Sequence, residues 1–260
     1  MFFTKMHGLG NDYLYHYGEL DYPGELAVKL SDRHFGIGSD GIITISPSQT
    51  ADFKMRIFNA DGSEAKMCGN GIRCVGKYVY EKGYTEKQTL KIETLSGIRS
   101  LELEIVGGKV ERVKVDMGKA EVKQPVTFTI DGEQIICTPV SVGNPHAVIF
   151  TEDAEHAPLD TLGAKLEKHE YFPDGVNVEF VQKTGRNSLR MRVWERGSGI
   201  TKSCGTGACA SAAAAVAAGI CTGGEEIVVQ LDGGKLYINM DTENVITMTG
   251  PAEKICECEV

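Results

Sequence analysis

The feature that most constrains the fold is an internal duplication. Residues 55–71, MRIFNADGSEAKMCGNG, align without a gap on residues 191–207, MRVWERGSGITKSCGTG. The shared residues are Met55, Arg56, Lys66, Cys68, Gly69 and Gly71, which recur as Met191, Arg192, Lys202, Cys204, Gly205 and Gly207. Unrelated segments of this length share about one residue. Gly10-Asn11 and Asp40-Gly41 also recur in order, as Gly143-Asn144 and Asp174-Gly175, so we predict two copies of one unit.

Each copy carries the local pattern of a strand, a loop and a helix. DFKMRIF and SLRMRVW alternate apolar and polar residues, as half-buried strands do. A polar loop and the motif C-G-x-G follow, and helices are predicted over about residues 71 to 82 and 207 to 218. The second helix is small and apolar on all sides, which predicts that it is buried within a sheet.

The rest of the chain favours antiparallel sheet. SLELEIVGGKVERVKVDM, FTIDGEQIICTPV and EIVVQLDGGKLYINM have the pattern of hairpins that turn at Gly-Gly, Asp-Gly and Asp-Gly-Gly. The predicted fold class is therefore α/β (α+β), with two domains, each a mostly antiparallel β-sheet around a central helix. We place the domains at residues 1–118 and 119–260, with the linker near residues 117–125.

Composition excludes several classes of function. The 27 Lys and Arg against 36 Asp and Glu give a net charge of −9, which has the wrong sign for a nucleic-acid partner. The N-terminus lacks the basic and apolar regions of a signal peptide, and no apolar run reaches the ~18 residues of a membrane span. We therefore expect a cytoplasmic protein with no membrane partner, in a compartment where thiols stay reduced.

The eight cysteines raise the question of a metal site or disulfides. There is no C-x2-C pair and no H-x3-H; the spacings C-x5-C, C-x4-C and C-x-C are not typical of structural zinc, so no metal is expected. A reducing compartment argues against disulfides. Cys68 and Cys204 are then either buried packing residues or reactive thiols.

Both cysteines precede a predicted helix, where unpaired N–H groups and the helix dipole favour an anion. This effect is worth up to about 2 kcal/mol, so a thiol with a pKa near ~8.5 would fall toward neutrality. The adjacent glycines let backbone amides approach a carboxylate. If the fold brings both helix ends together, one thiolate removes a proton while the other thiol delivers one, which inverts a stereocentre without pyridoxal phosphate.

Five motifs in this order carry a resemblance: KMHGLGNDYLY, FNADGSEAKMCGNGIRC, GNPHAV, GVNVEF and ERGSGITKSCGTGACA. With MTGPAEKI near the end, the chain resembles the diaminopimelate epimerase family over nearly its whole length. The resemblance implies cofactor-independent conversion of LL- to meso-diaminopimelate, in the biosynthesis of lysine and peptidoglycan precursors. It also implies pseudo-twofold-related domains with the active site in the cleft between them, a homodimer, and a final strand, 251–260, that returns to the first domain.

The resemblance also assigns residues. The acid and base correspond to Cys68 and Cys204, and His146 to a histidine that tunes the thiols. The amides that bind the reacting carboxylate correspond to Gly69, Asn70, Gly205 and Thr206, and the other substrate-binding side chains to Asn11, Asn59, Asn144, Asn177, Glu195 and Arg196. Glu195 also counts among the catalytic residues. Some members carry glutamine where this chain has Gly41. The pocket contact that the glutamine side chain makes must then be made by water or by backbone, or it is absent.

Several of these residues have a simpler interpretation. The four asparagines are also typical of turns. Arg196 next to Glu195 could form a solvated ion pair. His146 could be either a packing residue or a functional one. Cys74, Cys137, Cys209 and Cys221 are interpreted as packing residues, and the C-x-C at residues 256 and 258 as incidental. Two rival functions remain: a proline racemase-like enzyme with the same duplicated fold, and a thiol redox switch in which Cys68 and Cys204 form a disulfide.

Overall fold

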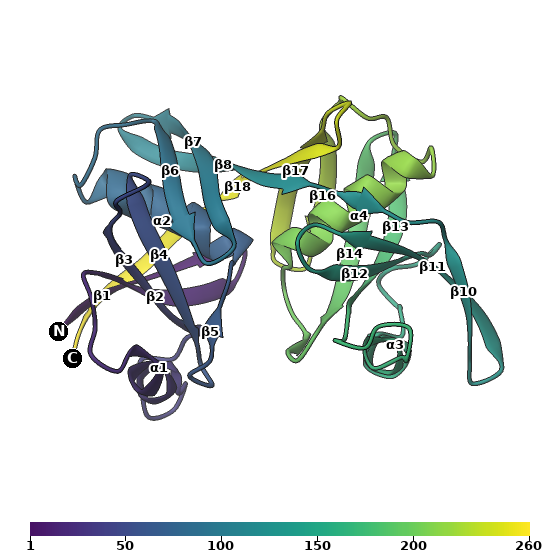
Figure 1. The fold of residues 1–260 in the computed structure, drawn as a ribbon, viewed down its shortest axis with the longest axis horizontal. Helices are drawn as coiled ribbons and strands as arrows, with labels where there is room; N and C mark the ends of the chain where they lie inside the picture. Colours follow the sequence, from purple (N-terminus) through teal and green to yellow (C-terminus); the bar gives the residue numbers. More distant parts are fainter. The chain divides into compact units, whose positions relative to one another are not determined.

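The computed structural model describes residues 1–260 and divides the chain into two compact units (Figure 1). The first unit contains Met1–Asp116 together with Thr249–Val260, and the second contains Met117–Met248. None of the helices is long and apolar enough to cross a bilayer.

The first unit is a mixed sheet with two helices, α1 (Pro23–Ser31) and α2 (Gly69–Glu81). Its strands are β1 (Phe2–Gly8), β2 (Asn11–Tyr17), β3 (Gly41–Pro47), β4 (Phe53–Asn59), β5 (Glu64–Ala65), β6 (Thr89–Thr94), β7 (Gly97–Val106), most of β8 (Lys109–Lys119) and β19 (Glu253–Glu259). β2 lies parallel to β3, β3 antiparallel to β4, β4 parallel to β6, and β6 antiparallel to β7. The last strand, β19, pairs antiparallel with β1, with Phe3 opposite Cys258.

The second unit repeats this order around α4 (Gly205–Ala217). Its other elements are β9 (Glu121–Val122), β10 (Val126–Ile130), β11 (Glu133–Ser141), β12 (Pro145–Phe150), the π-helical turn η1 (Leu159–Gly163), α3 (Ala164–Glu167), β13 (Asn177–Gly185), β14 (Ser188–Glu195), β15 (Gly199–Ile200), β16 (Ile227–Leu231), β17 (Gly234–Met240) and most of β18 (Val245–Pro251). β12 lies parallel to β13, β13 antiparallel to β14, β14 parallel to β16, and β16 antiparallel to β17. The shared pairing pattern confirms the predicted fold class and the duplication.

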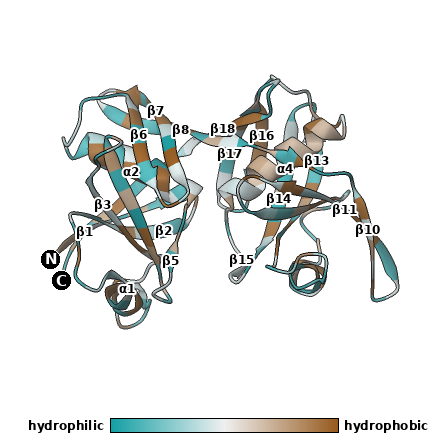
Figure 2. Cartoon of the chain, in the orientation of Figure 1, coloured by the Kyte–Doolittle hydropathy of each residue, from teal (hydrophilic) through white to brown (hydrophobic).

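The core of each unit forms where the sheet meets its long helix. On α2, the side chains of Ile72, Val75 and Val79 are fully buried, and the helix contacts β1, β2 and β7. Full burial of such a side chain stabilises the fold by about 1.5–3 kcal/mol. On α4 the alanines from Ala208 to Ala215 are buried on all sides, as the sequence predicts, and only the last one, Ala217, is exposed. Figure 2 shows the contrast: α4 is light brown along its length, whereas α2 also carries hydrophilic segments.

The three predicted hairpins are confirmed as β7–β8, β10–β11 and β16–β17. The predicted packing cysteines, Cys74, Cys137, Cys209 and Cys221, are all buried. Burial raises the pKa of Cys74 to about 11 and that of Cys137 to about 12, so both stay protonated at neutral pH.

Both long helices begin two residues earlier than predicted, at Gly69 and Gly205. In each, the preceding cysteine is the N-cap: Cys68 and Cys204 have extended backbone, and each sulfur accepts a hydrogen bond from the N–H three residues later. The glycines of C-G-x-G therefore belong to the first helical turn rather than to the loop. The helical segments α1, η1 and α3 had no counterpart in the sequence prediction.

Candidate active site

Cys68 lies at the N-terminus of α2, half-buried, with a donor and an acceptor against its sulfur. The Gly71 N–H donates to Sγ at 3.2 Å, and the thiol donates to Asn11 Oδ1 at 3.3 Å. The first amides of an α-helix lack acceptors within the helix, and its dipole favours negative charge at this end. The surroundings of the sulfur can therefore stabilise a thiolate through Gly71 and a thiol through Asn11.

Asn11 reaches this position because the chain reverses tightly between β1 and β2. Leu9 and Gly10 both have positive φ, 56° and 86°, and Gly10 takes this left-handed conformation without steric cost. Asn11 starts β2, and its Nδ2 donates to Asp40 Oδ2 at 2.7 Å. Asp40 itself precedes β3, the strand parallel to β2.

Arg73, on α2 itself, is fully buried. Its guanidinium donates to the Gly69 carbonyl at 3.1 Å, to Asn70 Oδ1 at 2.8 Å and to the Pro251 carbonyl at 3.0 Å. It therefore fixes two residues that were assigned to carboxylate binding and ties them to the segment that leads into β19. Arg73 was not among the predicted site residues, although a buried arginine on a helix requires such acceptors.

Asn59 ends β4, and its carboxamide is held at both ends: Oδ1 accepts from the Tyr13 hydroxyl at 3.4 Å, and Nδ2 donates to Ser63 Oγ at 3.1 Å. The neighbouring Gly41 has φ 153° and no room for a side chain. A Cβ there would lie 2.1 Å from the Phe58 carbonyl oxygen and 2.9 Å from the Tyr13 ring. The Tyr13 ring therefore lies against the position from which a glutamine side chain would start.

Cys204 lies at the N-terminus of α4 and is buried. The Gly207 N–H faces its sulfur at 3.4 Å, and the Thr206 hydroxyl lies 3.6 Å away. Burial raises the pKa of Cys204 well above its ordinary value, and the carboxylates of Glu195 and Glu179 raise it further. Within the free protein, this thiol therefore keeps its proton at neutral pH.

His146 and Glu179 form a fully buried pair beside α4, with Nδ1 and Oε1 2.6 Å apart. Because a carboxylate only accepts, Nδ1 carries the hydrogen. The other ring nitrogen lies 3.1 Å from Asn144 Oδ1, and Asn144 Nδ2 donates to Thr206 Oγ1 at 3.3 Å. This places His146 and Asn144, both predicted site residues, in one chain of contacts that leads to the Cys204 helix end.

Glu179 was not among the predicted site residues. It lies in β13, where Asn177, Val178, Phe180 and Val181 are also buried. A strand buried on both faces cannot expose a carboxylate, so a glutamate in such a run requires a partner. The acidic residue inside the motif GVNVEF was the available signal.

The Asn177 side chain contacts the backbone of Arg196. The Arg196 N–H donates to Asn177 Oδ1 at 3.0 Å, Asn177 Nδ2 donates to the Pro145 carbonyl at 3.0 Å, and the guanidinium donates to the Asp174 carbonyl at 2.9 Å. No ion pair joins Arg196 to Glu195, so the interpretation as a solvated pair is wrong. Arg196 is exposed to solvent.

Glu195 ends β14, where it accepts a hydrogen bond from the Thr201 hydroxyl. Burial raises the pKa of Glu195 above its ordinary value, although hydrogen bonds from Thr201 and Cys204 oppose the shift. The adjacent loop is held by Glu167, a buried residue that accepts from Trp194 Nε1 at 2.6 Å and from the Gly197 N–H at 2.9 Å.

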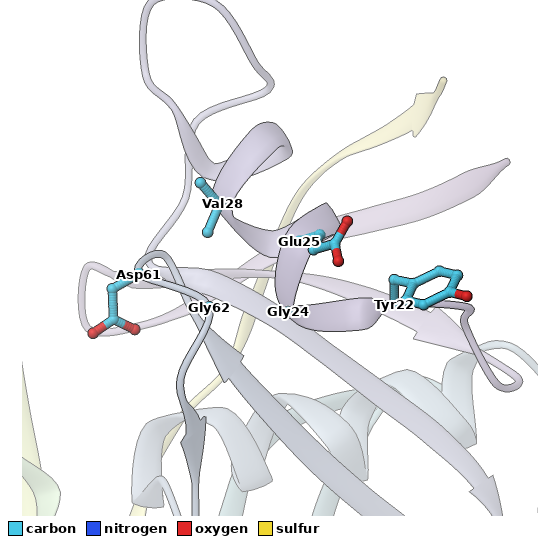
Figure 3. Close-up of a pocket in the computed structure, with 6 residues that line it drawn as sticks. All are labelled: Tyr22, Gly24, Glu25, Val28, Asp61 and Gly62. Carbon is cyan, nitrogen blue, oxygen red and sulfur yellow. The ribbon is translucent and has the colours of Figure 1, made fainter.

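A hollow of about 400 Å³ lies elsewhere in the first unit (Figure 3). Tyr22, Gly24, Glu25 and Val28 line it from the start of α1, and Asp61 and Gly62 from the turn after β4. None of these residues is a predicted site residue. Of the predicted residues, Asn11 contacts the Cys68 sulfur, and Glu195, Thr206 and Asn144 lie in the contacts around the Cys204 helix end. The Asn59 side chain instead contacts Tyr13 and Ser63, and the Arg196 guanidinium contacts the Asp174 carbonyl.

Comparison with known proteins bears on the chemistry of these helix ends. The sequence model of the diaminopimelate epimerase family matches residues 3–123 and 138–255. The diaminopimelate epimerase of Acetivibrio thermocellus is 50% identical over 277 residues, covering 100% of this chain and 98% of that protein. The enzyme of the same name from Bacteroides thetaiotaomicron is 51% identical over 265 residues, covering 99% of this chain and 97% of that protein.

Solved structures share the fold at much lower identity. A probable proline racemase from Agrobacterium radiobacter has a TM-score of 0.77 at 18% identity, covering 100% of this chain and 92% of that one. A Bacillus anthracis phenazine biosynthesis protein of the PhzF family has a TM-score of 0.76 at 18% identity, covering 100% and 98%. The fold is thus shared by several kinds of enzyme, whereas the sequence match over nearly the full length is specific: this chain is an isomerase that belongs to the diaminopimelate epimerase family.

Proposed function

We propose that the protein converts LL- to meso-diaminopimelate by two-base proton transfer between Cys68 and Cys204, without a cofactor. The observation that carries the proposal is the repeated sulfur cap: each long helix begins at a glycine, and the preceding cysteine sulfur accepts an N–H from its first turn. A duplicated pair of such thiols suits a reaction that needs one base and one acid. Membership of the family supports the choice of substrate.

In the proposed reaction one thiolate takes the α-proton, so a C–H bond breaks and an S–H bond forms. The other thiol gives its proton to the opposite face of the same carbon, so that an S–H bond breaks and a C–H bond forms. Between these steps the electron pair delocalises into the α-carboxylate. We assign the stabilisation of this negative charge to the first-turn amides of both helices, at Gly69, Asn70, Gly205 and Thr206. In a site that excludes water, each such donor contributes roughly a few kcal/mol.

The raised pKa of Cys204 supports its role as the acid in the first turnover of the free enzyme. Cys68 is then the base that acts on the LL isomer, and the two exchange roles in the reverse direction. His146, through Asn144 and Thr206, is assigned to the orientation of the Cys204 helix end.

We assign the distal amino-acid group of the substrate to Arg196 with Asn59, Asn144 and Asn177. A planar guanidinium matches a carboxylate in geometry, and Arg196 is exposed while its backbone is fixed by Asn177. Polar groups left unpaired in a closed pocket cost about 1–3 kcal/mol each, which would reject amino acids without a second head group.

The test is incubation with LL-diaminopimelate in deuterated water without added cofactor. Deuterium should enter one α-carbon as the meso isomer appears, and Cys68→Ala and Cys204→Ala should each abolish the conversion. Exchange with proline but not with diaminopimelate would favour the racemase alternative, which shares the fold. Loss of activity on metal chelation would contradict a reaction carried by the thiols alone.

We further propose that the enzyme acts in the biosynthesis of lysine and peptidoglycan precursors and forms a homodimer, as the family resemblance implies. Sedimentation of the purified protein at several concentrations measures the oligomeric state directly.

A further inference from the structure

A carboxylate outside the proposed reaction, Asp40, lies one side chain away from the Cys68 sulfur. Its backbone is fixed because its N–H donates to the Asp12 carbonyl at 2.7 Å and its carbonyl accepts from Ala60 at 2.9 Å. Oδ1 accepts from Arg33 Nη2 at 2.9 Å, and Oδ2 accepts from the Asp12 N–H at 3.0 Å and from Asn11 Nδ2 at 2.7 Å. Both carboxylate oxygens of Asp40 are therefore engaged.

This arrangement decides which way the Asn11 carboxamide points. A carboxylate can only accept hydrogen bonds, so Asn11 must turn its NH2 group toward Asp40. The carboxamide oxygen then faces Cys68, at 3.3 Å from Sγ. Reversing the carboxamide would set its oxygen against Asp40 Oδ2, where two acceptors repel. An amide oxygen only accepts as well, so the contact with Cys68 is favourable only while the sulfur carries its proton.

We propose that Asp40 is a positioning residue that fixes Asn11 as a hydrogen-bond acceptor for the Cys68 thiol. The Gly71 N–H and the helix dipole favour the thiolate, while the Asn11 oxygen opposes them and strengthens the hold of Cys68 on a proton. The importance of this balance rests on the proposed function, because a thiolate that binds its proton too weakly is a poor base toward a carbon acid.

In the second unit the equivalent asparagine, Asn144, has different hydrogen-bond partners. Asn144 Oδ1 meets His146, and its Nδ2 donates to Thr206 rather than to a carboxylate. Asp174, the counterpart of Asp40, contributes its carbonyl to Arg196 instead. The Cys204 thiol has an acceptor as well, the Glu195 carboxylate, but an asparagine oxygen that a second carboxylate orients toward the sulfur occurs only in the first unit and is not a consequence of the duplicated fold.

Other ionisable groups surround Cys68 and must be controlled for. Cys74 on α2 and Tyr15 on β2 interact with Cys68 electrostatically, and Arg73 is one residue from Cys74. The groups on the neighbouring strands and around Asp40 are Lys5, His7, Asp12 and Arg33. Asp12 provides a matched control, because it accepts from Arg33 and Lys5 but does not bind the Asn11 side chain. Asp12→Asn removes one negative charge from the same cluster and leaves Asn11 oriented.

The experiment is the pH dependence of Cys68 alkylation by iodoacetamide in reduced protein, followed by mass spectrometry of the Cys68 peptide. Asp40→Ala removes both acceptor oxygens and frees Asn11 to turn and donate to the sulfur, so the midpoint should fall by about one pH unit, the worth of one hydrogen bond. Asp12→Asn should produce a smaller fall. In an Asn11→Ala background, Asp40→Ala should shift the midpoint no more than Asp12→Asn does.

Equal shifts for Asp40→Ala and Asp12→Asn, or an Asp40→Ala shift that survives in Asn11→Ala, would overturn the proposal, because Asp40 would then act only as a charge. If Asp40→Ala does not fold, hydrogen exchange of the Asn11 side-chain amide in 15N-asparagine-labelled wild-type protein gives the answer. Slow exchange is expected, and exchange at the rate of an exposed amide overturns the proposal. Neither measurement uses substrate, so failure of the deuterium assay would contradict the proposed function separately.

Discussion

The substitution Glu179→Gln tests how the second unit sets the proton affinity of its thiol. Glu179 is fully buried, contacts His146 through Oε1 at 2.6 Å, and has no hydrogen-bond partner for Oε2. Glutamine keeps the size of the side chain and an oxygen for His146 while removing the charge. Since the Glu179 carboxylate raises the pKa of Cys204, the substitution should lower it.

The size of this pKa shift can be worked out from the separation of the two groups. A Cβ built on Gly207 would lie 2.7 Å from Glu179 Oε1 and 3.2 Å from Cys204 Sγ, so the carboxylate oxygen and the sulfur are close neighbours. A unit charge about 6 Å away at an effective dielectric constant of about 20 is worth about 3 kcal/mol, or about two pKa units.

The assay is the pH at half-maximal alkylation of Cys204, read from its peptide, in wild type and Glu179→Gln. Glu152→Gln, which removes an exposed carboxylate of the same unit, is the matched control and should leave the midpoint unchanged. A midpoint for Glu179→Gln that stays in place or rises would refute the argument, because the buried charge would then have no effect on the sulfur.

Three further predictions concern charged side chains. Arg73→Met leaves buried carbonyls without their donor and should lower the free energy of unfolding by about 2–5 kcal/mol, measured with urea, whereas Arg112→Met on the exposed side of β8 should change it by less than about 1 kcal/mol. Arg196→Met should damage diaminopimelate turnover while both thiols still alkylate; turnover equal to wild type would contradict the distal assignment. Burial raises the pKa of Asp12, but hydrogen bonds from Arg33 and Lys5 lower it on balance, so its contribution to stability is present at neutral pH and lost as the pH falls below about 4. Urea unfolding of Asp12→Asn should show a weaker loss over that range.

The elements that were predictable from the sequence are those with local causes. Alternation identified β4 and β14, and glycine turns identified the hairpins, because both signals lie within a few residues of the structure that they specify. The starts of α2 and α4 were misplaced because cysteine is not among the usual N-cap residues, so nothing marked Cys68 and Cys204 as caps. Helix α1 is only nine residues long, and its buried side chains face the sheet at too few positions to give a clear period.

The support of the site was less predictable because it depends on strand register. His146 and Glu179 meet because β12 and β13 are parallel, with His146 opposite Asn177. Glu179 is two residues after Asn177 and therefore lies on the same face of the sheet. Asn11 and Asp40 meet because β2 and β3 are parallel neighbours. Side chains 33 and 29 residues apart in sequence carry no mutual signal until that register is known.

The two halves thus agree in backbone and differ in side chains, and the proposed chemistry gives a reason for this. The sulfur cap is made by a cysteine, a glycine-containing first turn and the helix dipole, so it persists wherever that local sequence persists. Each cap by itself pulls its thiol toward the anion. Both halves then supply an opposing influence from different residues: the oriented Asn11 oxygen beside Cys68, and the carboxylates of Glu195 and Glu179 beside Cys204. A two-base reaction leaves the thiols with exchanged protons after each inversion, so the free enzyme must return to its first protonation state before the same isomer can react again. Under that requirement, side chains are free to diverge between the halves provided that both protonation states of the thiol pair stay accessible.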